Sequence, residues 1–101
     1  MVANKQDILK ALELNRTKLQ QLGVTRFGVF GSFVDDTQTE KSDVDLLVEF
    51  AEGKKNFRNF INTANLVESM LGRQIDLVTP NSLSKYIGPH IMKSIQYVQI
   101  T

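Results

Sequence analysis

The sequence contains no cysteine and only one histidine. The absence of thiols excludes disulfide bonds and zinc–thiolate sites, and a single histidine argues against a histidine-based zinc site. Any metal ion bound by this chain would therefore be held by oxygen atoms.

Long apolar runs are also missing. Nowhere does the sequence approach the ~18 consecutive apolar residues of a membrane-spanning helix, and residues 1–10 lack the apolar run of a signal peptide. We therefore expect a cytoplasmic protein with no membrane contact.

Neither sign of charge dominates the chain. Twelve lysines and arginines oppose eleven aspartates and glutamates, which leaves a net charge of +1. A protein that binds nucleic acid mainly through charge is strongly basic. Any contact with nucleic acid is thus expected to be indirect or confined to a small area.

The composition is otherwise that of an ordinary globular protein, with 42% hydrophobic and 23% charged residues. A chain of 101 residues lies at the small end of the usual domain size of about 100–150 residues. We therefore predict one domain over residues 1–101.

Apolar spacing predicts alternating helices and strands. Helices are expected over residues 4–22, with Asn4 as N-cap and Gly23 as terminator, and over residues 57–71, ending at Gly72. Short β-branched and aromatic runs predict strands. The other expected elements are strands over residues 26–30, 44–50, 74–78 and 97–100, a helical turn and loop over 35–42, and short helices over 82–86 and 89–95.

This order predicts an α/β (α+β) fold, a small mixed β-sheet with helices packed on it. The spacing does not give the strand order. Phe57, Phe60 and Ile61 follow helical spacing and are expected in the core rather than as a base-stacking platform. His90 is expected to have a surface or capping role.

Three polar features interrupt the apolar framework. They are Gly31-Ser32 after the first strand, Asp43 and Asp45 at the start of the second, and Asp76 within the third. Side chains alternate along a strand, so Asp43 and Asp45 share one face. If the second and third strands are neighbours, Asp76 can join them.

Clustered carboxylates need a cation. At about 4 Å, two unit charges repel by roughly 4 kcal/mol at an effective dielectric constant of about 20. Oxygen ligands favour hard cations, so Mg²⁺ or Mn²⁺ is the expected ion, with Asp43, Asp45 and Asp76 as ligands. Asp76 could also accept a proton from an attacking hydroxyl.

The glycine-serine pair has a matching role. Gly31 lets the backbone approach a ligand closely, and the amides that open the next helical turn can bind an anion such as a triphosphate. The predicted reaction is in-line attack of an acceptor hydroxyl on the α-phosphorus of a nucleoside triphosphate, assisted by two metal ions.

Each feature also has a purely structural interpretation. The glycine-serine pair can be an ordinary turn, Asp43 can cap a loop, and Asp45 can be solvated at a sheet edge. Asp76 can occupy an exposed strand position or pair with Arg73 or a lysine. A structural interpretation must explain all three features at once.

The segment GVFGSFVDDTQTEKSDVDLLVEF resembles the signature of the nucleotidyltransferase (DNA polymerase beta-like) superfamily, in which Gly-Ser is followed by Asp-x-Asp. Here ten residues separate Ser32 from Asp43. The resemblance continues through LGRQIDLVTP, which is similar to the segment with the family's third aspartate. It implies phosphate binding by Gly31 and Ser32, metal ligation by Asp43 and Asp45, and a role for Asp76 as third ligand and base.

Within the superfamily, the chain is most similar to the minimal nucleotidyltransferase (MNT) proteins, often encoded beside a HEPN-domain partner. The resemblance implies an antitoxin that transfers AMP from ATP to a tyrosine of a ribonuclease toxin. It also leaves room for a homo-oligomer. Transfer to an RNA end or to a small molecule such as an aminoglycoside is supported by neither charge nor length.

The chain departs from the family pattern after Gly-Ser. Many members have x-Ala-Arg-Gly, whereas this chain has Phe33-Val34-Asp35-Asp36, which places an acid where an arginine is common. Lys41 or Arg58 could supply the positive charge of the missing arginine only from other positions in the chain. The departure keeps open an alternative function, a catalytically inactive antitoxin that neutralises its partner by binding.

Overall fold

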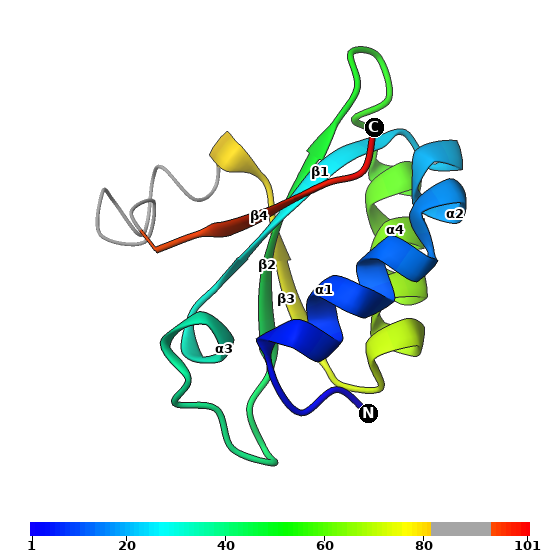
Figure 1. Cartoon of the computed structure of the whole chain (residues 1–101). Coiled ribbons are helices and arrows are strands. Elements are labelled where there is room, and N and C mark those ends of the chain that lie inside the picture. The colour runs from blue at the N-terminus through cyan, green and yellow to red at the C-terminus, as the bar shows by residue number, and fades with distance from the viewer. Residues whose placement is uncertain (82–93) are drawn as a thin grey trace.

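A four-stranded mixed sheet in the order β3-β2-β1-β4 organises the chain (Figure 1). This computed structural model describes residues 1–81 and 94–101. β1 pairs antiparallel with β2 and β4, and β2 pairs parallel with β3, so the strand of Asp45 and the strand of Asp76, whose order the sequence left open, are adjacent. The strands are β1 (Val24–Phe30), β2 (Val44–Phe50), β3 (Ile75–Val78) and β4 (Gln96–Gln99).

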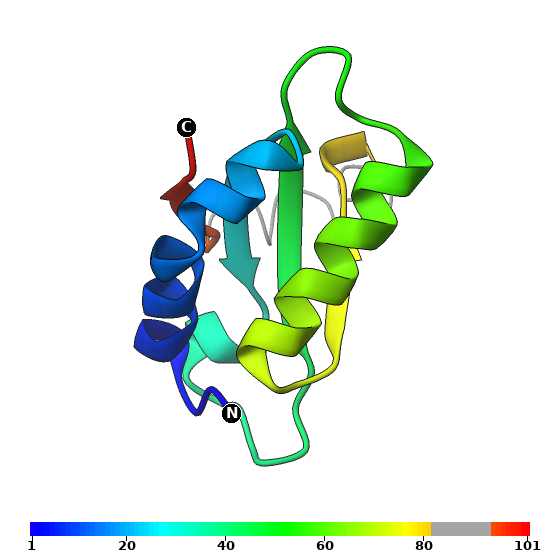
Figure 2. The same ribbon diagram turned by 90° about the vertical axis from the view of Figure 1, so that its right-hand side faces the viewer.

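Among the described residues, three helices cover one face of this sheet, as Figures 1 and 2 show. They are α1 (Lys5–Leu14), α2 (Arg16–Gln21) and α4 (Phe57–Leu71), while the short α3 (Ser32–Asp35) follows β1. Between the helices and the sheet lies the main core, where β1 and β2 turn fully buried apolar side chains toward the helices and Ile75 and Leu77 of β3 are partly buried. This core includes Ile8, Leu12, Leu19, Phe27, Val29, Leu46, Val48, Val67 and Leu71.

The opposite sheet face carries the alternate residues of the same strands. A smaller apolar cluster forms there around Phe30 and Leu47, with Val78, Ile95 and Tyr97 packed against it. The proposed catalytic carboxylates occupy this same face, at the end where β2 begins. β2 and β3 therefore supply the core with one set of side chains and the site with residues of the other set.

The predicted helix over residues 4–22 is wrong in one respect, because it is two helices divided at Asn15. The Asn15 amide group donates to the Ala11 carbonyl at 2.9 Å. Such a side chain competes with the backbone ladder and favours helix ends. The expected caps are confirmed: Asn4 accepts from the Asp7 amide, and Gly23 follows α2 with a φ of 87°.

The core assignments of Phe57 and Ile61 are also wrong. Phe57 is 79% exposed and Ile61 is 38% exposed, whereas Phe60 packs partly against the core. The buried face of α4 consists of Thr63, Val67 and Leu71, so Phe57 lies in the first turn, before that face begins.

The remaining differences concern element ends. The helical turn begins at Ser32 rather than at residue 35, and three strands differ from the expected bounds by one or two residues. The predicted helix over residues 82–86, His90 and most of the helix over 89–95 lie outside the described residues. Within the described part of the chain, no helix has the length and apolar content needed to cross a membrane.

Candidate active site

The strand register places two of the predicted site residues side by side. Asp45 is the cross-strand partner of Asp76 on β3 and of Phe30 on β1. Gly31 directly follows Phe30, and Asp43 precedes β2 by one residue. The glycine-serine turn and the three aspartates are thus gathered at one end of the sheet, as the sequence predicted.

Gly31 packs directly against the carboxylate of Asp45. Its φ is 75°, in the left-handed region that favours glycine. A methyl group added at this position would overlap Oδ2 of Asp45 and would also crowd its Cγ. The glycine is therefore required both by the backbone conformation and by the space that the carboxylate occupies.

Ser32 begins α3, the four-residue helix that follows this glycine. The amides of Val34 and Asp35 donate to the Gly31 carbonyl at 3.1 Å, which closes the turn. The first amides of a helix have no acceptor within it and can bind an anion. The turn thus presents its opening amides beside the carboxylate cluster.

The three carboxylates influence one another electrostatically. Burial raises the pKa of Asp45 above its usual value, and the negative charges of Asp76 and then Asp43 raise it further. Asp43 and Asp76 are themselves exposed. Asp76 occupies an exposed strand position, one of the alternatives that the sequence left open, because its side chain alternates with the inward Ile75 and Leu77 and belongs to the other face.

The donor set suits a hard cation, but the carboxylates do not already form a closed ligand group. Within residues 1–81 and 94–101, no three His, Cys, Asp or Glu side chains are arranged to hold an ion together. The oxygen-only chemistry and the adjacency of Asp45 and Asp76 fit Mg²⁺ or Mn²⁺. Mutual repulsion keeps like charges apart, so Asp43, Asp45 and Asp76 would have to turn toward one another to share an ion.

Arg73 does not pair with Asp76, which excludes one structural interpretation of this aspartate within the described residues. Its guanidinium group instead donates to backbone carbonyls of Val2 and of the loop before Asp43. Sequence reasoning missed this role. The only signal available was a lone arginine three residues before the third aspartate.

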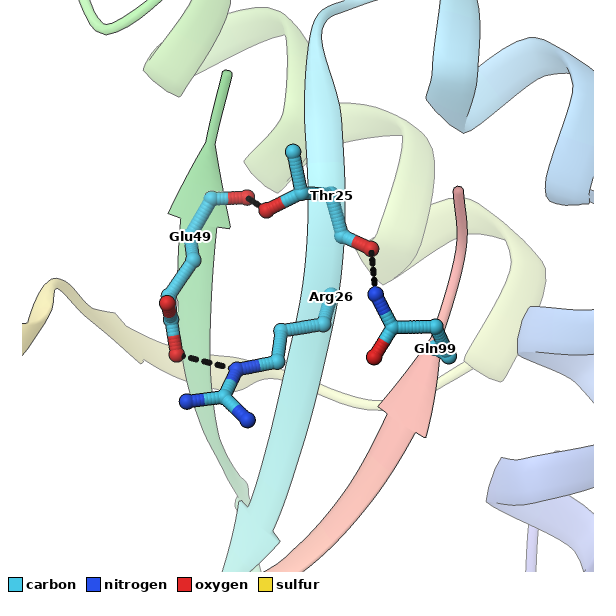
Figure 3. Close-up of polar contacts among 4 residues, drawn as sticks. All are labelled: Thr25, Arg26, Glu49 and Gln99. Atoms are coloured by element: carbon cyan, nitrogen blue, oxygen red, sulfur yellow. Dashed lines mark hydrogen bonds and ion pairs between the residues drawn. The ribbon is translucent and has the colours of Figure 1, made fainter. Parts of the chain in front are cut away.

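The far end of the same sheet face carries a separate polar group (Figure 3). Arg26 forms an ion pair with Glu49. The guanidinium carbon of Arg26 also lies 3.9 Å from the centre of the Tyr97 ring. Thr25 donates to the Glu49 carbonyl, and the Gln99 amide donates to the Thr25 carbonyl. These contacts join β2, β1 and β4 and leave the carboxylate end free of cations from this group.

Comparison with known proteins gives a consistent result. The family model for the nucleotidyltransferase domain matches residues 10–98. Protein adenylyltransferase MntA of Thermococcus cleftensis is 35% identical over 94 residues, which cover 92% of this chain and 94% of the relative. A protein of Methanocaldococcus jannaschii, provisionally named a protein adenylyltransferase, is 37% identical over 70 residues, 69% of this chain and 74% of its own.

Solved structures share the fold. One provisionally described as a minimal nucleotidyltransferase has a TM-score of 0.68 and 27% identity, and the match covers 87% of this chain and 93% of that one. A chain of a toxin–antitoxin crystal structure with AMP-PNP has a TM-score of 0.64 at 24% identity, covering 98% and 73%. The α/β fold expected from the sequence is confirmed.

Proposed function

Because this chain belongs to the nucleotidyltransferase domain family, we propose that it transfers AMP from ATP to a hydroxyl group of a partner protein. The observation that carries the proposal is the β2–β3 register, which sets Asp45 beside Asp76. Gly31 packs on the Asp45 carboxylate at the same point, so the turn and the carboxylates form one site.

Each site residue has a distinct part in the proposed reaction. Gly31 and Ser32 bind the triphosphate through the backbone amides that open α3. Asp43, Asp45 and Asp76 are the residues that would hold Mg²⁺ or Mn²⁺. When bound, the ion supplies positive charge that offsets the triphosphate and the departing pyrophosphate.

Asp76 is the proposed base, because it is the exposed carboxylate on the strand next to Asp45. It accepts the proton of the acceptor hydroxyl as the oxygen attacks the α-phosphorus of ATP. The new bond joins that oxygen to the α-phosphorus, and the bond to the bridging oxygen of pyrophosphate breaks. The partner gains AMP, and pyrophosphate leaves.

The proposed partner is a HEPN-domain toxin, with this chain as its antitoxin. The relatives named as protein adenylyltransferases support a protein acceptor, and the shared fold with a toxin–antitoxin chain crystallised with AMP-PNP supports a toxin partner. The HEPN domain of that toxin is proposed from the family resemblance alone. The acceptor hydroxyl is proposed to belong to a tyrosine of the toxin.

One observation favours a second candidate, an inactive antitoxin that acts by binding alone. Asp35 is exposed and lies in the same short helix as Ser32. Its negative charge opposes a triphosphate at the start of that helix. Activity therefore requires that the bound cation outweigh this repulsion.

Intact mass spectrometry tests the proposal. The chain is mixed with the purified partner encoded beside it, Mg²⁺ and each nucleoside triphosphate in turn. We expect the partner to gain the mass of one or more AMP units with ATP only. The double variant Asp43→Ala/Asp45→Ala should give no gain, whereas Glu40→Ala, a loop acid outside the site, should behave as the wild type.

An unchanged partner mass, together with a stable complex between the two proteins, would reject the transferase in favour of the inactive antitoxin. A gain with another nucleotide would keep the reaction and correct the donor.

A further inference from the structure

Arg73 binds the loop before Asp43 through backbone carbonyls only. Its Nη1 lies 3.1 Å from the Thr39 carbonyl oxygen, 3.0 Å from that of Glu40 and 3.0 Å from that of Ser42. Its Nε donates to the Val2 carbonyl at 2.7 Å. One side chain thus connects the N-terminal segment with the loop that leads into β2.

The guanidinium group suits this task better than an ammonium group would. It is planar and carries several N–H donors in fixed directions, so it can reach Val2 and the loop at the same time. Within residues 1–81 and 94–101, Arg73 has no ion pair with a carboxylate. Its hydrogen bonds therefore hold the backbone of the loop in place and do not neutralise the charges of the aspartates.

The loop before Asp43 is held partly by its own hydrogen bonds and partly by Arg73. The Thr39 amide donates to the Ser42 hydroxyl at 2.8 Å, and the Ser42 amide donates to the Thr39 carbonyl at 3.1 Å. The Glu40 and Ser42 carbonyls both accept a hydrogen bond from Arg73. The bond to the Ser42 carbonyl is partly buried, whereas those to Thr39 and Glu40 are exposed to solvent. A partly buried carbonyl that loses its donor is costly, so the Ser42 end of the loop depends most on this side chain.

Arg73 also lies close to chain neighbours of the other two parts of the site. Its guanidinium carbon lies 5.2 Å from the centre of the Phe33 ring, and Phe33 directly follows Ser32. Arg73 itself precedes β3 by two residues, and the intervening Gln74 carbonyl accepts from the Val44 amide at 3.0 Å.

Asp43 is the one carboxylate whose place depends on a loop. Asp45 and Asp76 are held in the sheet by their strand pairing, whereas Asp43 precedes the first paired residue of β2. We propose that Arg73 is a positioning residue that fixes Asp43 relative to Asp45 and Asp76 by holding the Ser42 carbonyl. The part of this inference that concerns catalysis rests on the proposed function. The part that concerns the position of the loop rests on the hydrogen bonds alone.

Amide hydrogen exchange of the chain alone tests the structural part. In Arg73→Gln we expect residues 37–43 to exchange about tenfold faster than in the wild type, while β1 and β2 keep their protection. Arg16→Gln is the matched control, because it removes an arginine from a surface ion pair with Glu13 and should leave the loop unchanged. Unchanged exchange of residues 37–43 in Arg73→Gln would overturn the proposal.

Arg73→Lys guards against a variant that does not fold. Lysine keeps the positive charge, but its single nitrogen cannot bind Val2 and the loop together. We therefore expect a loop exchange rate between that of the wild type and that of Arg73→Gln. Loop exchange equal to that of the wild type in a folded Arg73→Lys would likewise count against the proposal.

Mn²⁺ titration followed by NMR broadening of Asp45 and Asp76 tests the link to the site. We expect about tenfold weaker Mn²⁺ binding in Arg73→Gln, and a lower kcat with little change in KM for ATP. A wild type that binds no Mn²⁺ would defeat the proposed function, while the exchange result would still decide the role of Arg73. Equal Mn²⁺ binding in wild type and variant would overturn the positioning of Asp43.

Discussion

Asp45 lies where a carboxylate is unfavourable for folding. It is partly buried between β1 and β3, with Asp76 as its cross-strand neighbour and Gly31 packed on its oxygen. Burial and then the charges of Asp76 and Asp43 raise its pKa. A residue kept in such a place despite its cost to stability is typical of functional sites.

We therefore predict that Asp45→Asn stabilises the protein near neutral pH in a buffer with a metal chelator. The folded protein holds the Asp45 proton more tightly than the unfolded chain, so stability declines as the pH rises from the ordinary aspartate value through the raised pKa. Asparagine has no charge to bury. Urea unfolding should show a higher midpoint for the variant at pH 7.

Below the ordinary aspartate pKa, the two proteins should have similar midpoints, because Asp45 is then protonated in both states. Asp35→Asn, at an exposed position, serves as control and should change the unfolding free energy by less than about 0.5 kcal/mol. A lower urea midpoint for Asp45→Asn at pH 7 would contradict this prediction, because it would show that the folded protein stabilises the charged carboxylate.

Most of the site could be predicted at this scale, but not all of it. Side-chain alternation and the spacing of the aspartates placed Asp43, Asp45 and Asp76 together once β2 and β3 were neighbours. Arg73 could not be predicted, because its partners are backbone carbonyls, which every residue has. Only the folded loop shows which carbonyls face the guanidinium group.

At the scale of elements, helix periodicity located α4 correctly but did not identify which of its turns reach the sheet. Residues 57–71 form one helix, as expected. Whether its first turn is buried depends on where the sheet lies, which is tertiary information. The same limit applies to Asn15, where a local side-chain hydrogen bond interrupts the helix expected from the apolar spacing.

The burial difference within α4 gives a direct prediction. Phe57→Ser should change the free energy of unfolding by less than about 0.5 kcal/mol, because its side chain is already in solvent. Leu71→Ala, at a fully buried position, should cost about 2–5 kcal/mol. Both values come from urea denaturation monitored by circular dichroism.

A loss of more than about 1 kcal/mol in Phe57→Ser would show that the first turn of α4 contributes to the core after all.

Phe57 and Phe60 line a surface hollow of about 310 Å³ together with Lys55, Asn56 and Thr79. This hollow contains none of the proposed catalytic residues.

For the whole molecule, ligand binding distinguishes the two candidate functions. A ligand that binds only the folded state stabilises it by about 2.7 kcal/mol at a concentration 100 times its Kd. For a domain of this size, that corresponds to a Tm increase of roughly 10 °C or more. We expect such an increase with ATP and Mg²⁺ together in thermal unfolding of the wild type.

Asp43→Ala/Asp45→Ala should show little of this increase, since two of its three proposed ion-binding carboxylates are gone. An unchanged Tm in the wild type would agree with the inactive antitoxin and contradict the transferase.

The two-sided sheet has a consequence for how this protein tolerates insertions and deletions. β2 turns Leu46 and Val48 to the core and Asp45 to the opposite face, so a change of loop length by one residue that shifted the strand would exchange the two sets. Aspartate would then face the helices, and leucine would replace it at the site. The length of residues 36–43 is therefore constrained by folding and by chemistry at once, whatever their individual side chains.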